Sequence, residues 1–563
     1  MNIPWMTKRS LGFRLALLAT GASTLQLAHG QEILHVIDGP RGASYDQPWA
    51  APDGDGDGID DLLVVGFGSS FRGASGSLYS MATGAEIWFE PFGEWATNGL
   101  PCHSQRSSVI GDYDGDGDPD LAVGCSAFNT AFLPSEVFIV DMTTGAEVGR
   151  LLSQDIEFGD LPGPAGDTNG DGYADILVAD STGRQNLYLG PHGTLAMSFT
   201  GPSDRLISGW TVGDIDLDGG DDFLIGWGQS GIVDVHSGRT GALIGSLCAV
   251  PQFGCGGLYG AFAVPLGDTN ADGVSDFAIS AGNVNFPQGM GGVGGVRIIS
   301  GADLTILHSI YGRPKSASTS LDKFGSTIGG GHDVNGDGVA DLAVASVSTR
   351  GSYGSLVSGR TGQILYQVFS DGESGSLSLP PVEAVSSAQT IPDINGDGYA
   401  EWVVGSYGAN YGGFVSGRSI VLSGGPGDAE VICESTQNSS GRRAGLDFYG
   451  AITPFTRGSE LRIRRAVPGS VAAVLFGVES APQMMGSGVL CIDPTTLHRY
   501  AEIVPLDATG LGIRAVDWGD PSIHSGPSQW VTGATWTIQA IFRDPGSPSG
   551  FQTTDALRVQ FGG

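Results

Sequence analysis

Residues 53–61 read Asp-Gly-Asp-Gly-Asp-Gly-Ile-Asp-Asp and are followed at once by Leu62-Leu63-Val64-Val65. Acidic residues stand at positions 1, 3, 5 and 9 of this nine-residue stretch, and a glycine stands at position 6. The same pattern returns six more times, with Asn sometimes at position 3, and the copies begin 47 to 65 residues apart. A recurrence of this length indicates repeated supersecondary units in an array or a ring.

The residues at positions 1, 3, 5 and 9 are the candidate metal ligands. In chain order they are Asp53, Asp55, Asp57 and Asp61; Asp112, Asp114, Asp116 and Asp120; Asp167, Asn169, Asp171 and Asp175; Asp214, Asp216, Asp218 and Asp222; Asp268, Asn270, Asp272 and Asp276; Asp333, Asn335, Asp337 and Asp341; and Asp393, Asn395, Asp397 and Glu401.

This spacing suits calcium, a hard cation that takes six to eight oxygen ligands and that a tight loop can surround with alternating side chains. Glycine at position 6 permits the sharp turn. An EF-hand would need Glu at position 12 and a helix after it, but position 12 holds Val64, Val123 and Val178 in the first three copies. The pattern therefore predicts up to seven Ca²⁺ ions in loops that lead into strands, with a structural role. The fourth and fifth loops depart from the pattern at Gly219-Gly220 and at Ala271, which predicts weaker binding there.

Each repeat also has a second half, in which a Ser-Gly or Thr-Gly turn separates two apolar strands, as in residues 235–244 and 356–365. Four strands per repeat are the content of a propeller blade. After the seventh loop the repeat lacks its outer strand, and residues 31–39 resemble the outer strand of the preceding repeat, residues 362–369. We therefore predict an all-β fold, a seven-bladed β-propeller over residues 31–427, in which the N-terminal strand completes the last blade and leaves no open sheet edge.

These repeats resemble FG-GAP repeats, the blade units of integrin alpha chains and of many secreted bacterial proteins. The resemblance rests on the acidic signature and on Phe158-Gly159 and Phe324-Gly325, which match the Phe-Gly pair that precedes the loop in that family. It implies a calcium-binding propeller with a role in adhesion. Trp210 stands before the fourth loop and Ser386-Ser387-Ala388 before the seventh, where the family has its aromatic residue.

The two ends of the chain differ from the repeats. Residues 1–30 combine Lys8, Arg9 and Arg14 with an apolar stretch and a small-residue cleavage site, which is typical of a secretory signal peptide. Residues 428–563 follow a Gly-Pro linker, alternate apolar and polar positions, and predict a C-terminal β-sandwich. This region resembles a C-terminal module of secreted planctomycete-like proteins. The resemblance implies that the protein is exported, but it implies no activity.

Export also accounts for the six cysteines, because disulfides persist outside the cytosol. Fifteen pairings are formally possible. We expect the pairs that are neighbours in sequence, which are Cys102 with Cys125, Cys248 with Cys255, and Cys433 with Cys491.

The charge and the motifs restrict the function. The formal charge is −33, and the predicted calcium ions would offset 14 of these negative charges. Only 27 Lys and Arg occur, which argues against nucleic acid as a partner. No nucleophile elbow, zinc motif or phosphate loop occurs, so we expect no enzyme.

Two binding functions remain. The first is a monomeric, secreted or cell-surface scaffold, without a transmembrane segment in the mature chain, that adheres to an extracellular protein or to matrix. The second is a calcium-dependent lectin that binds a glycan. A lectin needs exposed aromatic rings that recur at one position, and Trp49, Trp88, Trp95, Trp210 and Trp227 do not recur in this way.

Overall fold

The structure is a computed structural model. It describes residues 33–39, 43–68, 74–92, 107–125, 135–154, 158–159, 162–201, 207–248, 261–281, 293–312, 323–347, 352–369, 385–406, 417–425, 430–433, 435–449, 459–516 and 535–560. Within these ranges every element is a strand apart from the short 3-10 helix η2 (Gly228–Ser230), so the all-β prediction is confirmed. No helix in them is long and apolar enough to cross a membrane. The predicted signal peptide, residues 1–30, lies outside these ranges.

The described chain contains seven sheets of four antiparallel strands, and six of these follow the chain order across the sheet. Their strands are β2 (Ala43–Ala51), β3 (Asp61–Gly68), β4 (Ser75–Tyr79) and β5 (Glu86–Glu90); β6 (Ser107–Gly111), β7 (Asp120–Cys125), β8 (Ser135–Asp141) and β9 (Glu147–Ser153); β10 (Gly163–Gly166), β11 (Asp175–Ala179), β12 (Arg184–Leu189) and β13 (Thr194–Thr200); β14 (Ile207–Gly213), β15 (Asp222–Trp227), β16 (Ile232–His236) and β17 (Leu243–Cys248); β18 (Ala263–Gly267), β19 (Asp276–Ser280), β20 (Gly295–Ile299) and β21 (Ile306–Tyr311); and β22 (Lys323–His332), β23 (Asp341–Val347), β24 (Tyr353–Val357) and β25 (Ile364–Phe369).

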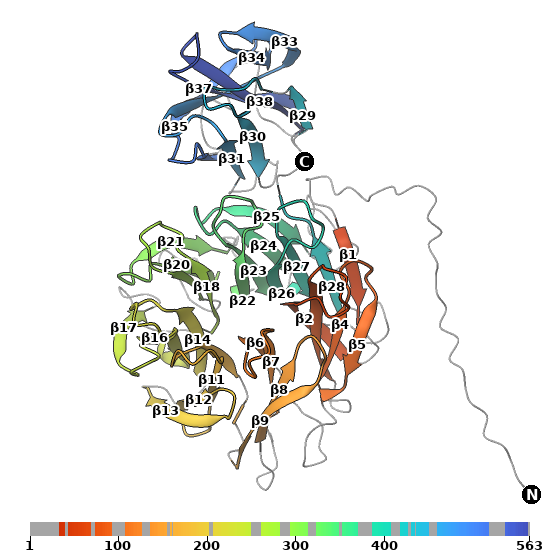
Figure 1. The fold of residues 1–563 in the computed structure, drawn as a ribbon, viewed down its shortest axis with the longest axis vertical. Coiled ribbons are helices and arrows are strands. Elements are labelled where there is room, and N and C mark those ends of the chain that lie inside the picture. Colours follow the sequence, from red (N-terminus) through yellow and green to blue (C-terminus); the bar gives the residue numbers. More distant parts are fainter. Residues whose placement is uncertain are drawn as a thin grey trace, which may run out of the picture.

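These sheets lie around a ring (Figure 1), which is the arrangement of a β-propeller. The first strands of successive sheets contact one another from β6 through β10, β14, β18 and β22 to β26 (Val385–Ile391), and β26 in turn contacts β2. The remaining junction, between β2 and β6, is made by Gln47, whose side-chain oxygen accepts hydrogen bonds from the backbone and the hydroxyl of Ser107 at 3.3 and 3.0 Å.

The seventh sheet joins the two ends of the ring, as the sequence predicts. Its order is β1 (Ile33–Asp38), β28 (Arg418–Leu422), β27 (Glu401–Ser406) and β26. Strand β1 is the outer strand and runs antiparallel to β28, so that Asp38 lies opposite Arg418. The Arg418 guanidinium donates two hydrogen bonds to the Asp38 carboxylate, at 2.6 and 3.0 Å. This bidentate ion pair fixes the register of the closing strand.

The apolar run after each acidic loop becomes the second strand of its sheet and is buried on both faces. Leu62, Leu63, Val64 and Val65, for example, are fully inaccessible to solvent. Neighbouring sheets share their cores, because alternate side chains of these strands enter the clusters on either side. Burial of this apolar surface at about 25 cal/mol per Å² is the main force that holds each sheet to the next.

The C-terminal residues form a separate group of strands. A five-stranded sheet has the order β29 (Glu430–Cys433), β38 (Phe551–Gln560), β37 (Thr535–Arg543), β32 (Val471–Gly477) and β35 (His498–Pro505). A three-stranded sheet contains β30 (Gly445–Tyr449), β31 (Ser459–Arg464) and β36 (Gly512–Val516), and a hairpin contains β33 (Glu479–Met485) and β34 (Gly488–Ile492). The five-stranded and three-stranded sheets contribute to a single core.

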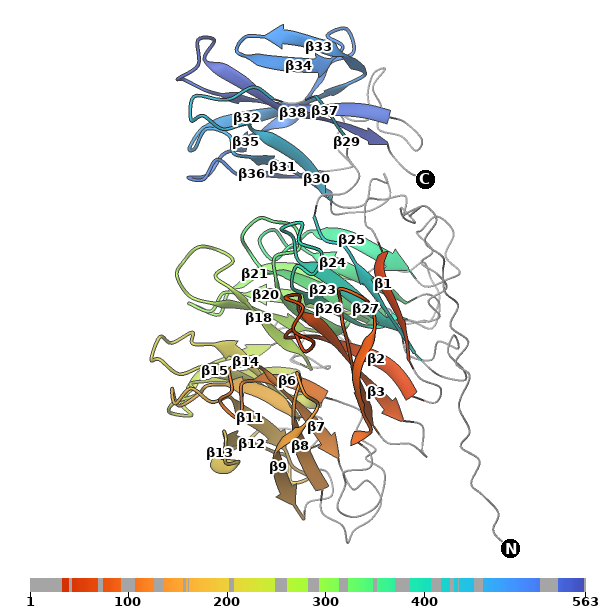
Figure 2. The same ribbon diagram turned by 45° about the vertical axis from the view of Figure 1, so that its right-hand side comes forward.

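Of the predicted cysteine pairs, the structure joins Cys433 on β29 to Cys491 on β34. The other two predicted pairs each include a residue, Cys102 or Cys255, outside the described ranges. The C-terminal unit lies beside the sixth sheet in both views (Figure 1, Figure 2), and β31 contacts β25 there.

Replacement of Asp38 tests how strongly the closing strand holds the ring. Asp38→Asn keeps the size of the side chain but removes the negative charge that faces the Arg418 guanidinium, whose side chain is only 9% exposed. We expect a loss of about 1–3 kcal/mol in stability. Glu479→Gln, which breaks the exposed pair with Arg558, is the matched control and should cost less than about 1 kcal/mol. Thermal unfolding compares the two variants, and equal shifts in Tm would contradict the role of Asp38.

Candidate metal centres in the acidic loops

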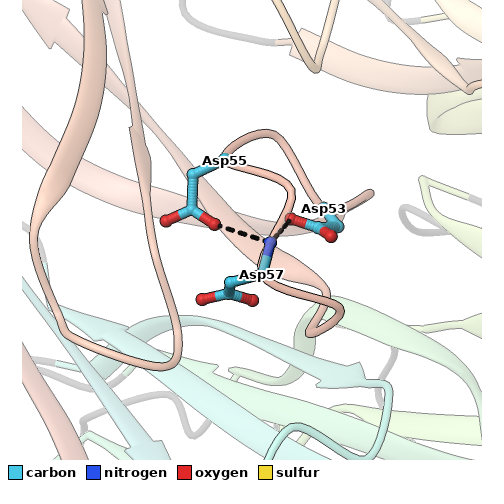
Figure 3. Close-up of side chains that lie close together, drawn as sticks. All are labelled: Asp53, Asp55 and Asp57. Atoms are coloured by element: carbon cyan, nitrogen blue, oxygen red, sulfur yellow. Dashed lines mark hydrogen bonds between the residues drawn. The ribbon is translucent and has the colours of Figure 1, made fainter.

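Each acidic loop connects the first and second strands of its sheet, so all seven lie at equivalent places in the ring. In the first loop, the Asp53 carboxylate accepts hydrogen bonds from the backbone N–H groups of Gly56, Asp57 and Gly58 at 2.6–3.0 Å. The Asp57 N–H also donates to Asp55, and the three carboxylates gather on one side of the loop (Figure 3).

All seven loops share this hydrogen-bonded backbone conformation. The backbone N–H at position 6 donates to the carboxylate at position 1 in every copy, at 2.6–3.0 Å. The repeated spacing in the sequence therefore corresponds to a repeated backbone conformation, and the candidate ligands at positions 1, 3 and 5 start from the same geometry in each loop.

Positions 4 and 6 of every loop have positive φ angles. Position 6 is always glycine, with φ between 81° and 101°. Position 4 has φ between 61° and 86° and tolerates Leu217 in the fourth loop and Ala271 in the fifth. A side chain can occupy the left-handed helical region near 60° at a modest cost, whereas values near 90° favour glycine. The sequence pattern indicated the need for glycine at position 6, but it did not indicate that position 4 also has a positive φ angle.

The acid at position 9 is buried beneath the loop. In each copy it accepts a hydrogen bond from the backbone N–H at position 2, at 2.7–3.0 Å. In five copies its other oxygen accepts the N–H of a residue just beyond the third strand, and these donors are Met81, Gly190, Gly238, Gly301 and Gly359. This acid therefore fastens the start of the loop to the next turn of the same sheet.

Burial raises the pKa of most of these acids. The pKa of Asp61, Asp175 and Asp222 rises to about 6, that of Asp120 to about 7, and that of Glu401 to about 8. Ionisation of a carboxyl in such a place is unfavourable unless a positive charge lies near it. A cation bound in the loop would supply that charge.

The carboxylates of four loops meet closely enough to share one ion. The groups are Asp53, Asp55 and Asp57; Asp112, Asp114 and Asp120; Asp214, Asp216 and Asp218; and Asp393, Asp397 and Glu401, each with oxygen atoms within 4.8 Å of one another. The fourth loop is among them, despite its departure from the sequence pattern. The third and fifth loops have Asn at position 3, and Asn169 and Asn270 donate to the neighbouring Asp171 and Asp272.

The seventh loop fits a metal ion best. One oxygen of the fully buried Glu401 carboxylate accepts the Ile394 N–H at 2.8 Å. The other oxygen is buried without a hydrogen-bond partner among the described residues. A buried carboxylate oxygen without a partner is unfavourable in an empty loop, and a hard cation held by Asp393, Asp397 and Glu401 would satisfy it.

Neighbouring loops are joined through their backbones. The N–H at position 8 of one loop donates to the carbonyl at position 1 of the preceding loop between Ala174 and Asp112, between Asp221 and Asp167, and between Ala400 and Asp333, at 2.7–3.2 Å. These three pairs of neighbouring loops are therefore in direct backbone contact.

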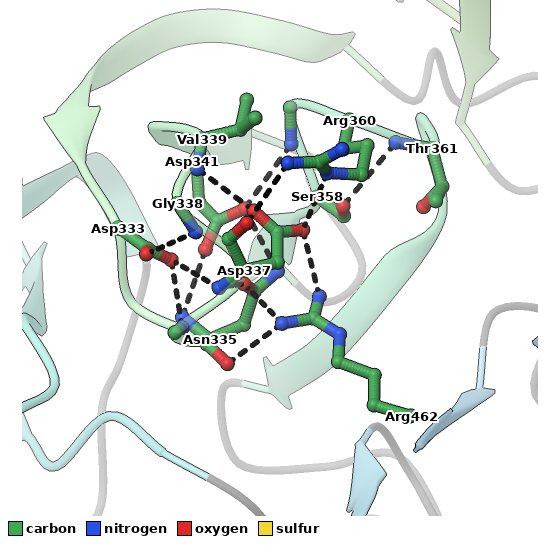
Figure 4. Close-up of polar contacts among 12 residues, drawn as sticks. Asp333, Asn335, Asp337, Gly338, Val339, Asp341, Ser358, Arg360, Thr361 and Arg462 are labelled. Carbon is green, nitrogen blue, oxygen red and sulfur yellow. Dashed lines mark hydrogen bonds and ion pairs between the residues drawn. The ribbon is translucent and has the colours of Figure 1, made fainter. Parts of the chain in front are cut away.

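The sixth loop differs from the others because the C-terminal unit reaches into it (Figure 4). The Arg462 guanidinium, on β31, donates to the backbone and side-chain oxygens of Asn335 and lies 3.0 Å from the Asp337 carboxylate. Asn335, Asp337 and Arg462 are all buried, whereas the residues at positions 3 and 5 of the seventh loop are exposed. Sequence reasoning missed Arg462, which lies outside the repeats and belongs to no motif.

The tryptophans considered as sugar platforms have structural roles where the structure describes them. Trp210 and Trp227 are buried, and their ring N–H groups donate to Ala261 and Asp234. Trp88 donates to the carbonyl of Thr143 and packs against a core cluster. Trp95 lies outside the described residues. These positions offer no support for a lectin.

The comparisons with known proteins find partial similarity to integrin alpha chains. The chain is 27% identical over 207 residues to integrin alpha-V of Gallus gallus, an alignment that covers 32% of this chain and 19% of the relative. It is 33% identical over 147 residues to integrin alpha-E of Mus musculus, covering 24% of this chain and 12% of the relative. This chain therefore matches less than a fifth of the length of either relative. No family model matches it.

Among solved structures, the chain is similar to the WD40 repeats of RRP9, with a TM-score of 0.43, 10% identity, and coverage of 70% of this chain and 97% of the other. It is also similar to U3-55K, with a TM-score of 0.40, 10% identity, and coverage of 70% and 98%. The ring of four-stranded sheets itself, together with the partial similarity to integrin alpha chains, defines a β-propeller repeat protein.

Two alanine variants of the seventh loop test the backbone requirement. A Cβ added at Gly396 or at Gly398 would contact no other atom within 4 Å, so only the φ angles of 76° and 90° distinguish the two positions. We expect Gly398→Ala to lower stability by roughly 1–2 kcal/mol and Gly396→Ala by less than about 1 kcal/mol. Thermal unfolding in excess chelator measures both, and an equal or reversed order would show that position 6 has no special requirement.

Proposed function

We propose that this chain is a calcium-stabilised, seven-bladed β-propeller followed by a β-sandwich, and that it acts as a secreted or cell-surface scaffold for adhesion to an extracellular protein or to matrix. The observation that carries the proposal is the common geometry of the acidic loops. In the seventh loop this geometry leaves a buried Glu401 oxygen without a partner, at the place where an ion would bind.

Calcium would act by neutralising the carboxylates that each loop brings together. Extracellular calcium sites have a Kd of about 10⁻⁴ to 10⁻³ M, and extracellular calcium is present at millimolar concentrations. An occupied site of this affinity would stabilise the folded state by about 0.5–2 kcal/mol.

The role in adhesion is supported by the similarity to integrin alpha chains and by the architecture. A closed ring of sheets is a rigid support for the loops at its faces, which suits recognition of a large partner. A carboxylate bound to calcium is a poor general acid, so the loops also fit a non-enzymatic scaffold better than a hydrolase.

Removal of calcium and a single loop variant test the metal sites. Excess chelator should lower the Tm of the chain markedly relative to millimolar calcium. Asp397→Asn should reduce this calcium-dependent stabilisation by up to about 0.5–2 kcal/mol, the contribution of one site, because the amide oxygen can still accept the Tyr399 N–H at 2.9 Å while the charge is lost.

Asp303→Asn is the matched control for this test. Asp303 also accepts a backbone N–H, that of Thr305 at 3.0 Å, but it lies in a turn outside the acidic loops. Its variant should keep the full response to calcium. A chain whose Tm does not change with chelator would refute the calcium proposal.

Binding measurements address the scaffold role. Calcium-loaded protein should bind to surfaces coated with extracellular matrix protein, and this binding should disappear with chelator. The same sample on a glycan array is the comparison. Binding to glycans alone would replace adhesion with the lectin hypothesis.

A further inference from the structure

We infer that the sixth acidic loop is a socket for Arg462 rather than a calcium site. The guanidinium takes the place that an ion would take and thereby docks the C-terminal unit on the ring. The inference rests on the proposed calcium function for the comparison with the other loops, but its own evidence is the contacts of Arg462.

The strand that carries Arg462 presents it to the loop. Side chains alternate along β31, and Leu461 and Ile463 on either side of Arg462 are buried in the core of the C-terminal unit. Arg462 consequently projects from the opposite face, where it contacts Asn335 at 2.5 and 2.7 Å and Asp337 at 3.0 Å. An alternating strand would normally expose this side chain to solvent, yet none of its surface is exposed.

Within the loop, the guanidinium engages the oxygens that calcium would need. Position 3 contributes the Asn335 side-chain oxygen and position 5 contributes the Asp337 carboxylate, and both belong to the predicted ligand set. A cation bound by these oxygens would lie next to the buried guanidinium charge, and two positive charges in such contact repel strongly at low dielectric. Arg462 and calcium therefore exclude one another.

The orientation of Asn335 supports this exclusion. In the third, fifth and seventh loops, the Asn amide nitrogen donates to the aspartate at position 5, at 2.8–3.1 Å. In the sixth loop the amide nitrogen of Asn335 donates to Asp341 at 3.0 Å instead, and its oxygen accepts from Arg462. The sixth loop is thus arranged around the guanidinium.

The fourth loop shows that an arginine in the position of Arg360 is compatible with a group of three close carboxylates. Arg360 donates to the carbonyl of Asp337 at 2.8 Å, and the corresponding Arg239 donates to the carbonyl of Gly219 in the fourth loop at 2.7 Å. The fourth loop nevertheless keeps three carboxylates close enough to share an ion. What the sixth loop has in addition is the arginine from the C-terminal unit.

The start of the linker between the two units, at Gly424 and Gly425, also contacts the sixth loop. The Gly425 N–H donates to the carbonyl of Val334 at 2.8 Å, and its carbonyl accepts the Tyr366 hydroxyl at 3.0 Å. A side chain at Gly424 would collide with the carbonyl of Ala400. Two separate segments of the chain thus meet at the sixth loop, as expected of an interdomain joint.

Hydrogen exchange of the full chain, with and without calcium, tests the inference. The N–H groups of Gly338 in the sixth loop and of Gly58 and Gly398 in the first and seventh report on equivalent hydrogen bonds. Chelator should speed exchange in the first and seventh loops by about tenfold or more and change the sixth by less than about twofold. A sixth loop that responds like the other two would overturn the inference.

Arg462→Met provides the second arm, and Arg558→Met is the matched control, because Arg558 lies on β38 in an exposed ion pair with Glu479. In chelator, only Arg462→Met should speed exchange in the sixth loop, and calcium should reverse the effect. Equilibrium dialysis should then find one more bound calcium per chain than in the wild type. An Arg462→Met variant with unchanged exchange and unchanged stoichiometry would refute the socket.

The two proposals fail in different ways. If chelator affects neither the first nor the seventh loop, the calcium function fails. The effect of Arg462→Met on exchange in the sixth loop still decides whether the arginine holds that loop.

Discussion

The main constraint on this structure is the concentration of negative charge in the acidic loop near the start of each sheet. Three side chains with carboxylate or amide oxygens gather above the loop, and a fourth acid is buried beneath it with its oxygens on backbone N–H groups. The backbone amides satisfy the hydrogen bonds of these groups but not their charge. Under the proposed function each of these loops takes up a cation, and the loops differ in where that positive charge comes from.

In the seventh loop one oxygen of the buried Glu401 has no hydrogen-bond partner among the described residues, and an ion taken from the solvent would satisfy it. In the sixth loop the chain supplies the charge itself. Arg462 acts against the burial and the neighbouring Asp337, both of which raise the pKa of Asp341. If the other loops bind calcium as proposed, the same repeated loop serves either as an ion site or as a docking point for the C-terminal unit, according to what packs against it.

Much of this architecture could be predicted from the sequence because it repeats. The nine-residue pattern identified every loop, the apolar runs identified the buried second strands, and the likeness between residues 31–39 and residues 362–369 identified the closing strand, which pairs with β28. The pairing of Cys433 with Cys491 followed from adjacency in the sequence. These inferences rest on local patterns, which single sequences record well.

The contacts that escaped prediction are long-range and occur once. Arg462 stands in an ordinary alternating strand, and nothing near Asn335 in the sequence distinguishes it from Asn169. Only the tertiary arrangement brings the two together, across 127 positions of sequence. The positive φ angle at position 4 was also not predicted, because two of the seven copies have Leu217 or Ala271 there and glycine is therefore not invariant at this position.

The closure of the ring has a mechanical consequence. The C-terminal unit is attached at the sixth loop and through the linker, and the N-terminal strand is the edge of the adjacent seventh sheet. The shortest path for a tensile force between that unit and the N-terminal end of the chain runs through these two adjacent sheets. The pairing of β1 with β28 and the contacts of the sixth loop would therefore be the first to bear such a load.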